Sequence, residues 1–263
     1  MCSIERSPET LESLRKVFTC IDNTTLEGCD THQKVRELCR KSLEMHDNTR
    51  GIGHVAAVCV YPVFVSEAKR CLAHSDIHVA SVAGAFPAGQ SPLAVKLQEV
   101  QYAVDEGADE IDMVISRGLL IEGEQSRVFD EIAAIRAITQ GRVLKVILET
   151  GELKTESLIA QASQIAIDAG ADFIKTSTGK IAVSATLEAS EIMLNIIKKH
   201  FERTGKWVGF KAAGGISTPA EVLKYYQLVN HILGNKQTTN QFFRIGASRL
   251  TDKLFSFLTE YIF

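Results

Sequence analysis

Long apolar runs are missing from this sequence, and none approaches the ~20 residues that a membrane-spanning helix needs. The N-terminal segment, MCSIERSPETLESLRK, is polar and charged and lacks the apolar middle of a signal peptide. An excess of basic residues is also missing, because 29 Lys and Arg are dispersed among 32 Asp and Glu, for a net charge of −3. We therefore expect a cytoplasmic protein that binds neither nucleic acid nor membranes.

Motifs for metal ions and disulfides are absent as well. The six cysteines all lie in the first third of the chain, and none forms a CxxC pair. The seven histidines are scattered, with no HExxH motif. His74 and His78 are four residues apart, but SDIHVASV is typical of the start of a strand. We expect reduced, mostly structural thiols and no metal site.

Eight short apolar runs recur along the 263 residues, without a linker-like break. They are rich in β-branched residues, which is typical of parallel strands buried on both faces. They are KVFTCID (16–22), HVAAVCVY (54–61), HVASVAGAF (78–86), EIDMVI (110–115), RVLKVILE (142–149), DFIKTS (172–177), WVGFKAAG (207–214) and FFRIGAS (242–248). Helical stretches between them, such as 95–107, 128–141 and 158–170, end in glycine, a common helix C-cap.

The spacing of these runs predicts an α/β fold. Most starts fall roughly 30–35 residues apart, and eight such strand–helix units make a (β/α)8 TIM barrel. An open, doubly wound sheet is the alternative, but the regular spacing favours the closed form. We expect one domain over residues 1–263, with an extra N-terminal helix around TLESLRKV.

Two lysines interrupt apolar strands. Lys175 lies in FIKTSTGK and Lys211 in VGFKAAGG. Charged side chains are rarely buried, because removing water from an ammonium is costly. A desolvated amine beside a second cation loses its proton more easily and can then attack carbonyls. The pair predicts amine chemistry, whereas the alternative is a strand-end lysine that reaches solvent.

An internal repeat adds a carboxylate to these lysines. The segments DEGADEIDMVIS (105–116) and DAGADFIKTSTG (168–179) share a helix end, the turn GAD and a strand. Asp112 follows Gly107 by five residues, as Lys175 follows Gly170. Because alternate barrel strands share interior layers, we expect Asp112 and Lys175 to point inward at one level and exchange a proton.

Glycine-rich turns follow the last two predicted strands. Such turns often bind phosphate in these barrels, so we expect a phosphate site at Gly214, Gly215, Gly246 and Ser248. Two nucleotide-binding interpretations fail. TSTGK lacks the first glycine of a P-loop and has Ile181 after Lys180, and GIGHVA (51–56) precedes a strand instead of following one.

Five other polar residues lie at strand ends or inside strands. Asp22 and Thr24 could bind substrate hydroxyls or cap a helix. Cys59 is either an inert buried thiol or a side chain that faces the pocket. Lys145 and Glu149 share one face of the fifth strand and could complete an ionic network, or Lys145 could simply neutralise a nearby acid.

Taken together, these motifs resemble the class I deoxyribose-phosphate aldolases. The resemblance rests on FPAG (86–89), ETGEL (149–153), GADFIKTSTGK (170–180), GFKAAGG (209–215) and FRIGAS (243–248), in the expected order. It runs from CIDNTTL near residue 20 to GAS near residue 248.

The resemblance implies reversible cleavage of 2-deoxy-D-ribose 5-phosphate, a small phosphorylated sugar, to D-glyceraldehyde 3-phosphate and acetaldehyde. It implies that Lys175 forms a Schiff base, that Lys211 lowers the pKa of Lys175, and that Asp112 takes part in proton transfer. No metal or organic cofactor is then needed, since the protonated imine is the electron sink. The phosphate end would be held by Thr178, Gly179, Lys180 and the Gly214–Gly215 turn.

Three positions depart from the family pattern. Ala212 replaces a common proline, and Arg249 replaces a small hydroxyl residue, where it either grips phosphate or points outward. Some bacterial members have a C-terminal tail whose tyrosine reaches the site, but no such role is assigned to Tyr261. The sequence is also compatible with a homo-oligomer. The alternatives are a phosphate-binding barrel that performs acid–base isomerisation and a non-catalytic binding scaffold.

Overall fold

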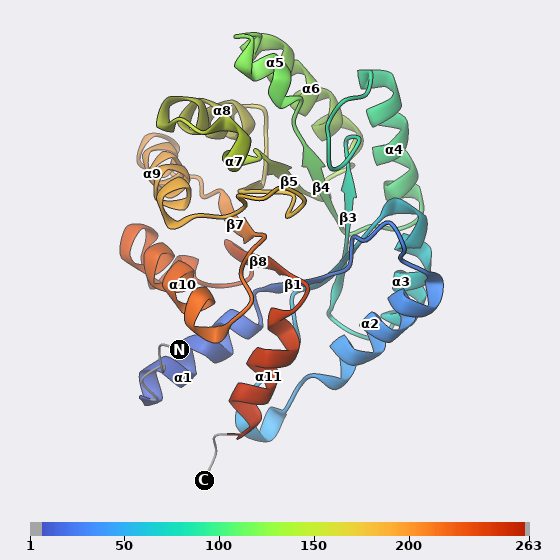
Figure 1. Cartoon of the computed structure of the whole chain (residues 1–263), viewed down its shortest axis with the longest axis vertical. Coiled ribbons are helices and arrows are strands. Elements are labelled where there is room, and N and C mark those ends of the chain that lie inside the picture. The colour runs from blue at the N-terminus through green and yellow to red at the C-terminus, as the bar shows by residue number, and fades with distance from the viewer. Residues whose placement is uncertain (1–6, 261–263) are drawn as a thin grey trace.

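The computed structural model describes residues 7–260, so Tyr261 lies outside the described part of the chain. Eight parallel strands pair in chain order and close between β8 and β1. Helices surround the barrel (Figure 1), which confirms the predicted (β/α)8 fold. The strands are β1 (Ile21–Thr24), β2 (Ala57–Val60), β3 (His78–Ala83), β4 (Glu110–Val114), β5 (Val143–Ile147), β6 (Phe173–Lys175), β7 (Gly209–Ala213) and β8 (Phe243–Ala247).

An extra N-terminal helix precedes the barrel, as predicted, and packs against α10 and α11. No helix within residues 7–260 combines the length and apolar character needed to cross a bilayer. The helices are α1 (Pro8–Phe18), α2 (His32–Glu44), η1 (Asn48–Arg50), η2 (Pro62–Phe64), α3 (Val65–Cys71), α4 (Leu93–Asp105), α5 (Arg117–Ile121), α6 (Gln125–Ile138), α7 (Thr150–Leu153), α8 (Glu156–Asp168), α9 (Leu187–Thr204), α10 (Pro219–Leu233), η3 (Asn235–Gln237) and α11 (Leu250–Glu260).

The predicted start of the first strand is wrong. Residues 16–18 belong to α1, and β1 begins only at Ile21. Leu14, Val17 and Phe18 are all fully buried at helical spacing, so the apolar residues in this run are the inner face of the helix. A short apolar run has no periodicity of its own that separates a strand from a buried helical turn.

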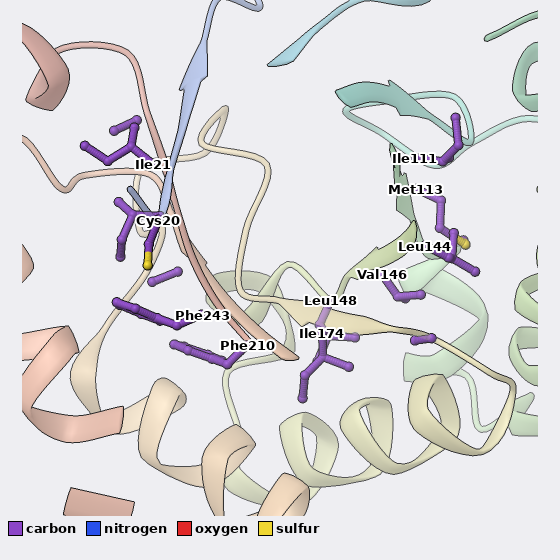
Figure 2. Packing of buried hydrophobic residues seen from close by; sticks show 14 of the residues in the cluster. Cys20, Ile21, Ile111, Met113, Leu144, Val146, Leu148, Ile174, Phe210 and Phe243 are labelled. Carbon is purple, nitrogen blue, oxygen red and sulfur yellow. The ribbon is translucent and has the colours of Figure 1, made fainter. Parts of the chain in front are cut away.

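The strands of the barrel carry two kinds of residue in alternation. Ile111, Met113, Leu144 and Val146 belong to the large apolar cluster that packs the strands against the helices (Figure 2). The residues between them on β4 and β5, such as Asp112, point into the barrel. Inside, β2 and β3 contribute only uncharged side chains, among them Cys59, to a small apolar cluster that Val114 of β4 and Ile147 of β5 complete. The other six strands also contribute charged groups.

The GAD repeat has one structure in both copies. Gly107 and Gly170 have positive φ at the ends of α4 and α8, as the predicted C-caps require. Asp109 then accepts a hydrogen bond from the Val79 amide, and Asp172 accepts one from the Leu144 amide, both at 2.8 Å. The repeat thus fixes β4 and β6 to their preceding strands and sets the register of Asp112 and Lys175. The third helix differs, because α6 ends at Ile138 and the glycine at 141 lies in the following turn.

Candidate active site

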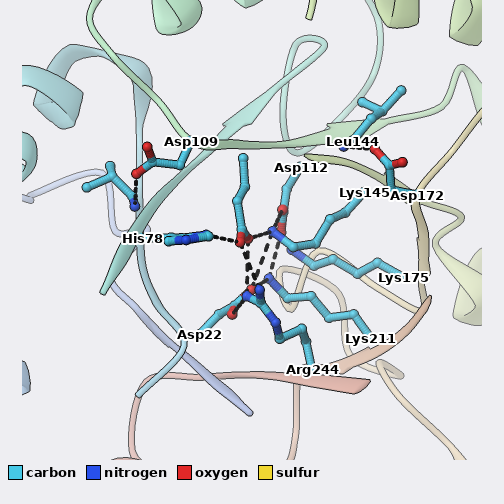
Figure 3. Close-up of polar contacts among 12 residues, drawn as sticks. Asp22, His78, Asp109, Asp112, Leu144, Lys145, Asp172, Lys175, Lys211 and Arg244 are labelled. Carbon is cyan, nitrogen blue, oxygen red and sulfur yellow. Dashed lines mark hydrogen bonds and ion pairs between the residues drawn. The ribbon is translucent and has the colours of Figure 1, made fainter. Parts of the chain in front are cut away.

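A cluster of mutually contacting charged side chains fills one side of the barrel interior (Figure 3). All of them are at least 95% buried. The group, here called the interior ion cluster, consists of Asp22, Glu110, Asp112, Lys145, Lys175, Lys211 and Arg244.

Asp112 is the centre of the cluster. Its Oδ1 accepts a hydrogen bond from Lys145 Nζ at 2.6 Å, and its Oδ2 accepts from Lys175 Nζ and Lys211 Nζ, each at 2.7 Å. Lys175 and Lys211 are direct neighbours in the sheet register of β6 and β7. The predicted proximity of Asp112 and Lys175 is therefore confirmed.

A second layer of the cluster holds the remaining charges. Arg244 donates to Asp22 Oδ1 at 2.7 Å and to Glu110 Oε1 at 2.8 Å. Lys211 also contacts Asp22, and Lys145 also contacts Glu110. Asp22 thus belongs to the cluster, and it caps no helix, since the N-cap of α2 is Thr31.

Charge balance singles out Lys175. Four cations face three carboxylates, and each cation except Lys175 contacts at least two of these carboxylates. A net charge inside a protein is costly, so the cation with the fewest partners loses its proton first. Burial lowers the pKa of Lys175, and Lys211 lowers it further against the opposing effect of Asp112. Burial opposes the charge of Lys211 too, but Asp112 and Asp22 raise its pKa overall.

A pocket of about 190 Å³ opens above the cluster at the carboxyl ends of the strands. Of the seven cluster residues, Lys175 alone lines it. The nitrogen most able to become a neutral nucleophile is therefore the one that a bound molecule can reach.

The predicted phosphate-binding residues surround this pocket. Arg249 also lines it, whereas Cys59 lies in the apolar part of the barrel interior, where burial raises the pKa of its thiol. The predicted residues that line the pocket are Thr24, Thr178, Gly179, Lys180, Gly214, Gly215, Gly246 and Ser248.

Two of these glycines leave room that a side chain would take. Gly214 has φ +85°, and a Cβ there would lie 2.5 Å from the Ser184 side chain. A Cβ on Gly246 would lie 3.1 Å from Cε of Lys211. Glycine at these positions therefore shapes the pocket floor and admits the Lys211 side chain.

Glu149 has a role that the sequence did not indicate. It does not join the interior ion cluster, which corrects the expectation of a network shared with Lys145. It is fully buried in the left-handed conformation (φ 59°), and it accepts hydrogen bonds from the Thr178 amide at 3.2 Å and the Thr178 hydroxyl at 2.5 Å. Thr178 therefore has its amide and hydroxyl hydrogens turned toward Glu149, and the loop after β6 is anchored to the end of β5.

Comparison with known proteins places this chain in a family. Residues 16–228 match the model of the DeoC/LacD family aldolases. The deoxyribose-phosphate aldolase of Bos taurus is 46% identical over 250 residues, and that of Homo sapiens is 45% identical; each alignment covers 90% of this chain and 78% of the relative. The tetrameric deoxyribose phosphate aldolase of Aeropyrum pernix superposes with a TM-score of 0.73 at 25% identity, over 98% of this chain and all of that one. The chain therefore belongs to the DeoC/LacD family of aldolases.

Proposed function

We propose that this protein is a deoxyribose-phosphate aldolase, a lyase that reversibly cleaves 2-deoxy-D-ribose 5-phosphate to D-glyceraldehyde 3-phosphate and acetaldehyde in deoxyribose phosphate catabolism. The observation that carries the proposal is the buried Lys175 amine, which opens onto a polar pocket beside Asp112 and Lys211. The names of its relatives support the substrate. Release of acetaldehyde from the substrate by the purified protein, in a chelator and without added metal, tests it; no release would contradict it.

The reaction follows from the chemistry of a neutral amine. Lys175 Nζ attacks the C1 aldehyde and loses water to form an imine, which is then protonated. As the C3 hydroxyl loses its proton, the C2–C3 bond breaks, and its electron pair moves toward the iminium nitrogen. This releases D-glyceraldehyde 3-phosphate and leaves an enamine. Protonation of the enamine at C2 and hydrolysis of the imine then release acetaldehyde and free Lys175. We assign the proton transfers to Asp112 and Lys211, which are hydrogen-bonded to each other and lie behind Lys175, the cluster residue that lines the pocket.

The phosphate group would lie at the outer end of the pocket. Its partners would be backbone amides of the turns at Gly179, Gly214–Gly215 and Ser248, with Lys180 and Arg249 supplying positive charge. We propose no metal or organic cofactor, since the protonated imine accepts the electron pair.

Replacing Glu149 by alanine should weaken the binding of the phosphorylated substrate. The change leaves the Thr178 amide and hydroxyl without their acceptor, so the loop from Thr178 to Lys180 loses its anchor. We expect a rise in KM of about tenfold, the size of one or two lost hydrogen bonds, with a smaller change in kcat. Glu152→Ala is the control, because Glu152 lies in α7, the short helix that follows Glu149, but is exposed and pairs with Arg117 of α5. Equal KM values for Glu149→Ala and the unmodified protein would show that the anchor is dispensable.

Replacing Asp112 by asparagine should slow proton transfer more than imine formation. The amide cannot accept and release a proton, and general acid–base groups contribute about 10²- to 10⁴-fold. Turnover is compared with the rate at which borohydride traps acetaldehyde, and circular dichroism verifies folding. If trapping and turnover fall by the same factor, Asp112 positions the lysines and does not relay protons.

We further propose that residues 1–263 act as one catalytic domain in the cytoplasm. The single closed barrel of the described residues supports the first point. The five free cysteines of the described chain support the second, because unpaired thiols are typical of reducing compartments. A homo-oligomer is also proposed, with the tetrameric relative as support.

A further inference from the structure

His78 approaches the interior ion cluster from the opposite end of the barrel to the pocket. It is the first residue of β3, and its side chain is 51% exposed. Its Nδ1 lies 2.8 Å from Oε1 of Glu110, which is fully buried. Figure 3 shows the imidazole directed toward the cluster. A group that titrates near neutral pH and exchanges protons with solvent is therefore in contact with a buried carboxylate.

A continuous chain of contacts joins this imidazole to the catalytic amine. Glu110 contacts Lys145, which donates to Asp112 at 2.6 Å, and Asp112 accepts from Lys175 at 2.7 Å. Every member of the chain between His78 and Lys175 is fully buried. Charge placed on His78 is therefore screened less by water than a charge on the surface would be.

Two of the other charged groups that face His78, Asp109 and Arg244, are already paired with opposite charges. Asp109 pairs with Lys69 at 2.8 Å, and Arg244 is shared between Glu110 and Asp22. Asp76 lines the same surface hollow as His78, at the edge of the barrel. Glu110 is the largest influence and raises the pKa of His78, so the imidazole carries a proton over more of the neutral range.

We propose that His78 is a positioning residue for the aldolase reaction, and that a proton on its imidazole favours the neutral, nucleophilic form of Lys175. The three carboxylates of the cluster are balanced by Lys145, Lys211 and Arg244. A further proton on either Lys175 or His78 leaves a net positive charge, so protons on the two groups oppose each other. The inference rests on the proposed function, because it assigns the nucleophile to Lys175.

His78→Gln tests this coupling, because glutamine can donate a hydrogen bond to Glu110 but carries no charge. The rising limb of the kcat/KM profile should move to higher pH by about half a unit, as expected for one charge acting through several side chains. A shift of this size lowers kcat/KM about threefold on the rising limb and leaves kcat/KM at the plateau unchanged. His78→Lys, which keeps the charge, should restore the original limb. His74→Gln is the control, since His74 is exposed in the loop just before β3.

A second readout separates this inference from the proposed function. Acetylation of Lys175 by acetic anhydride, followed across pH by peptide mapping, reports the ionisation of the amine without turnover and should show the same shift. If the unmodified protein showed no aldolase activity, that result would contradict the proposed function but not the coupling between His78 and Lys175. The role of His78 would be overturned if the pH profile of His78→Gln overlaid that of the unmodified protein, or if it were lowered equally at every pH. Either result counts, whether it comes from kcat/KM or from acetylation of Lys175.

Discussion

Lys175→Arg should abolish aldolase turnover while leaving the barrel folded. Arginine can keep a hydrogen-bond donor beside Asp112, which accepts from Lys175 at 2.7 Å, so the contact of this side chain with the interior ion cluster is retained. A guanidinium remains protonated and forms no imine. We expect a loss of at least about 10⁴-fold, as when the nucleophile of a covalent enzyme is removed. Cleavage of 2-deoxy-D-ribose 5-phosphate and intact mass after treatment with acetaldehyde and borohydride measure the effect.

Lys180→Arg is the matched control for this substitution. Lys180 lines the same pocket, but its ammonium pairs with the exposed Glu27 and lies outside the ion cluster. Lys180→Arg should still form the reduced acetaldehyde adduct on Lys175 after treatment with borohydride. Substantial turnover by folded Lys175→Arg would instead favour the acid–base isomerase alternative, whose chemistry requires no amine.

Lys211→Leu should raise the pKa of Lys175 and lower turnover at neutral pH. The ammonium of Lys211 disfavours a second charge on Lys175, so its removal lets Lys175 hold its proton to higher pH. Each unit by which the pKa of Lys175 rises leaves about tenfold less neutral amine, at any fixed pH below the new pKa. We expect a loss of about 10- to 100-fold near pH 7 that recovers in part as the pH rises. The pH dependence of kcat measures the shift.

The same substitution should also destabilise the protein. Lys211 contacts both Asp22 and Asp112, and breaking a buried ion pair costs about 3–5 kcal/mol. Urea unfolding measures this loss, and Lys211→Arg is the control that retains the charge. Near-normal turnover of Lys211→Leu at neutral pH would contradict the assigned effect on Lys175.

Much of the fold and the centre of the site could be predicted, because the alternation of residues along a strand indicates both the strand and the side chains that face inward. A charged residue between buried apolar neighbours, as in EIDMVI, has to face inward when its neighbours pack against helices. The GAD repeat then places Asp112 and Lys175 at one level, since each aspartate of the repeat pairs with the preceding strand. The glycine turn after β7 was likewise predictable, because Gly214 and Gly215 directly follow the strand end, whereas Gly246 of the expected second turn lies inside β8.

The rest of the cluster depends on contacts that no local pattern indicates. Arg244 and Glu110 are 134 residues apart in sequence, and either side chain alone would be expected to reach solvent. Glu149 leaves the expected ionic network because its left-handed backbone turns it toward Thr178. Both features require the closed barrel, which brings β8 beside β1 and carries the strand ends to one face.

The most direct test of the account is borohydride reduction of the unmodified protein in the presence of acetaldehyde, followed by intact mass and peptide mapping. We expect a single reduced two-carbon adduct, located on Lys175, the cluster amine that lines the pocket. An adduct on another lysine, or no adduct on folded protein, would contradict it.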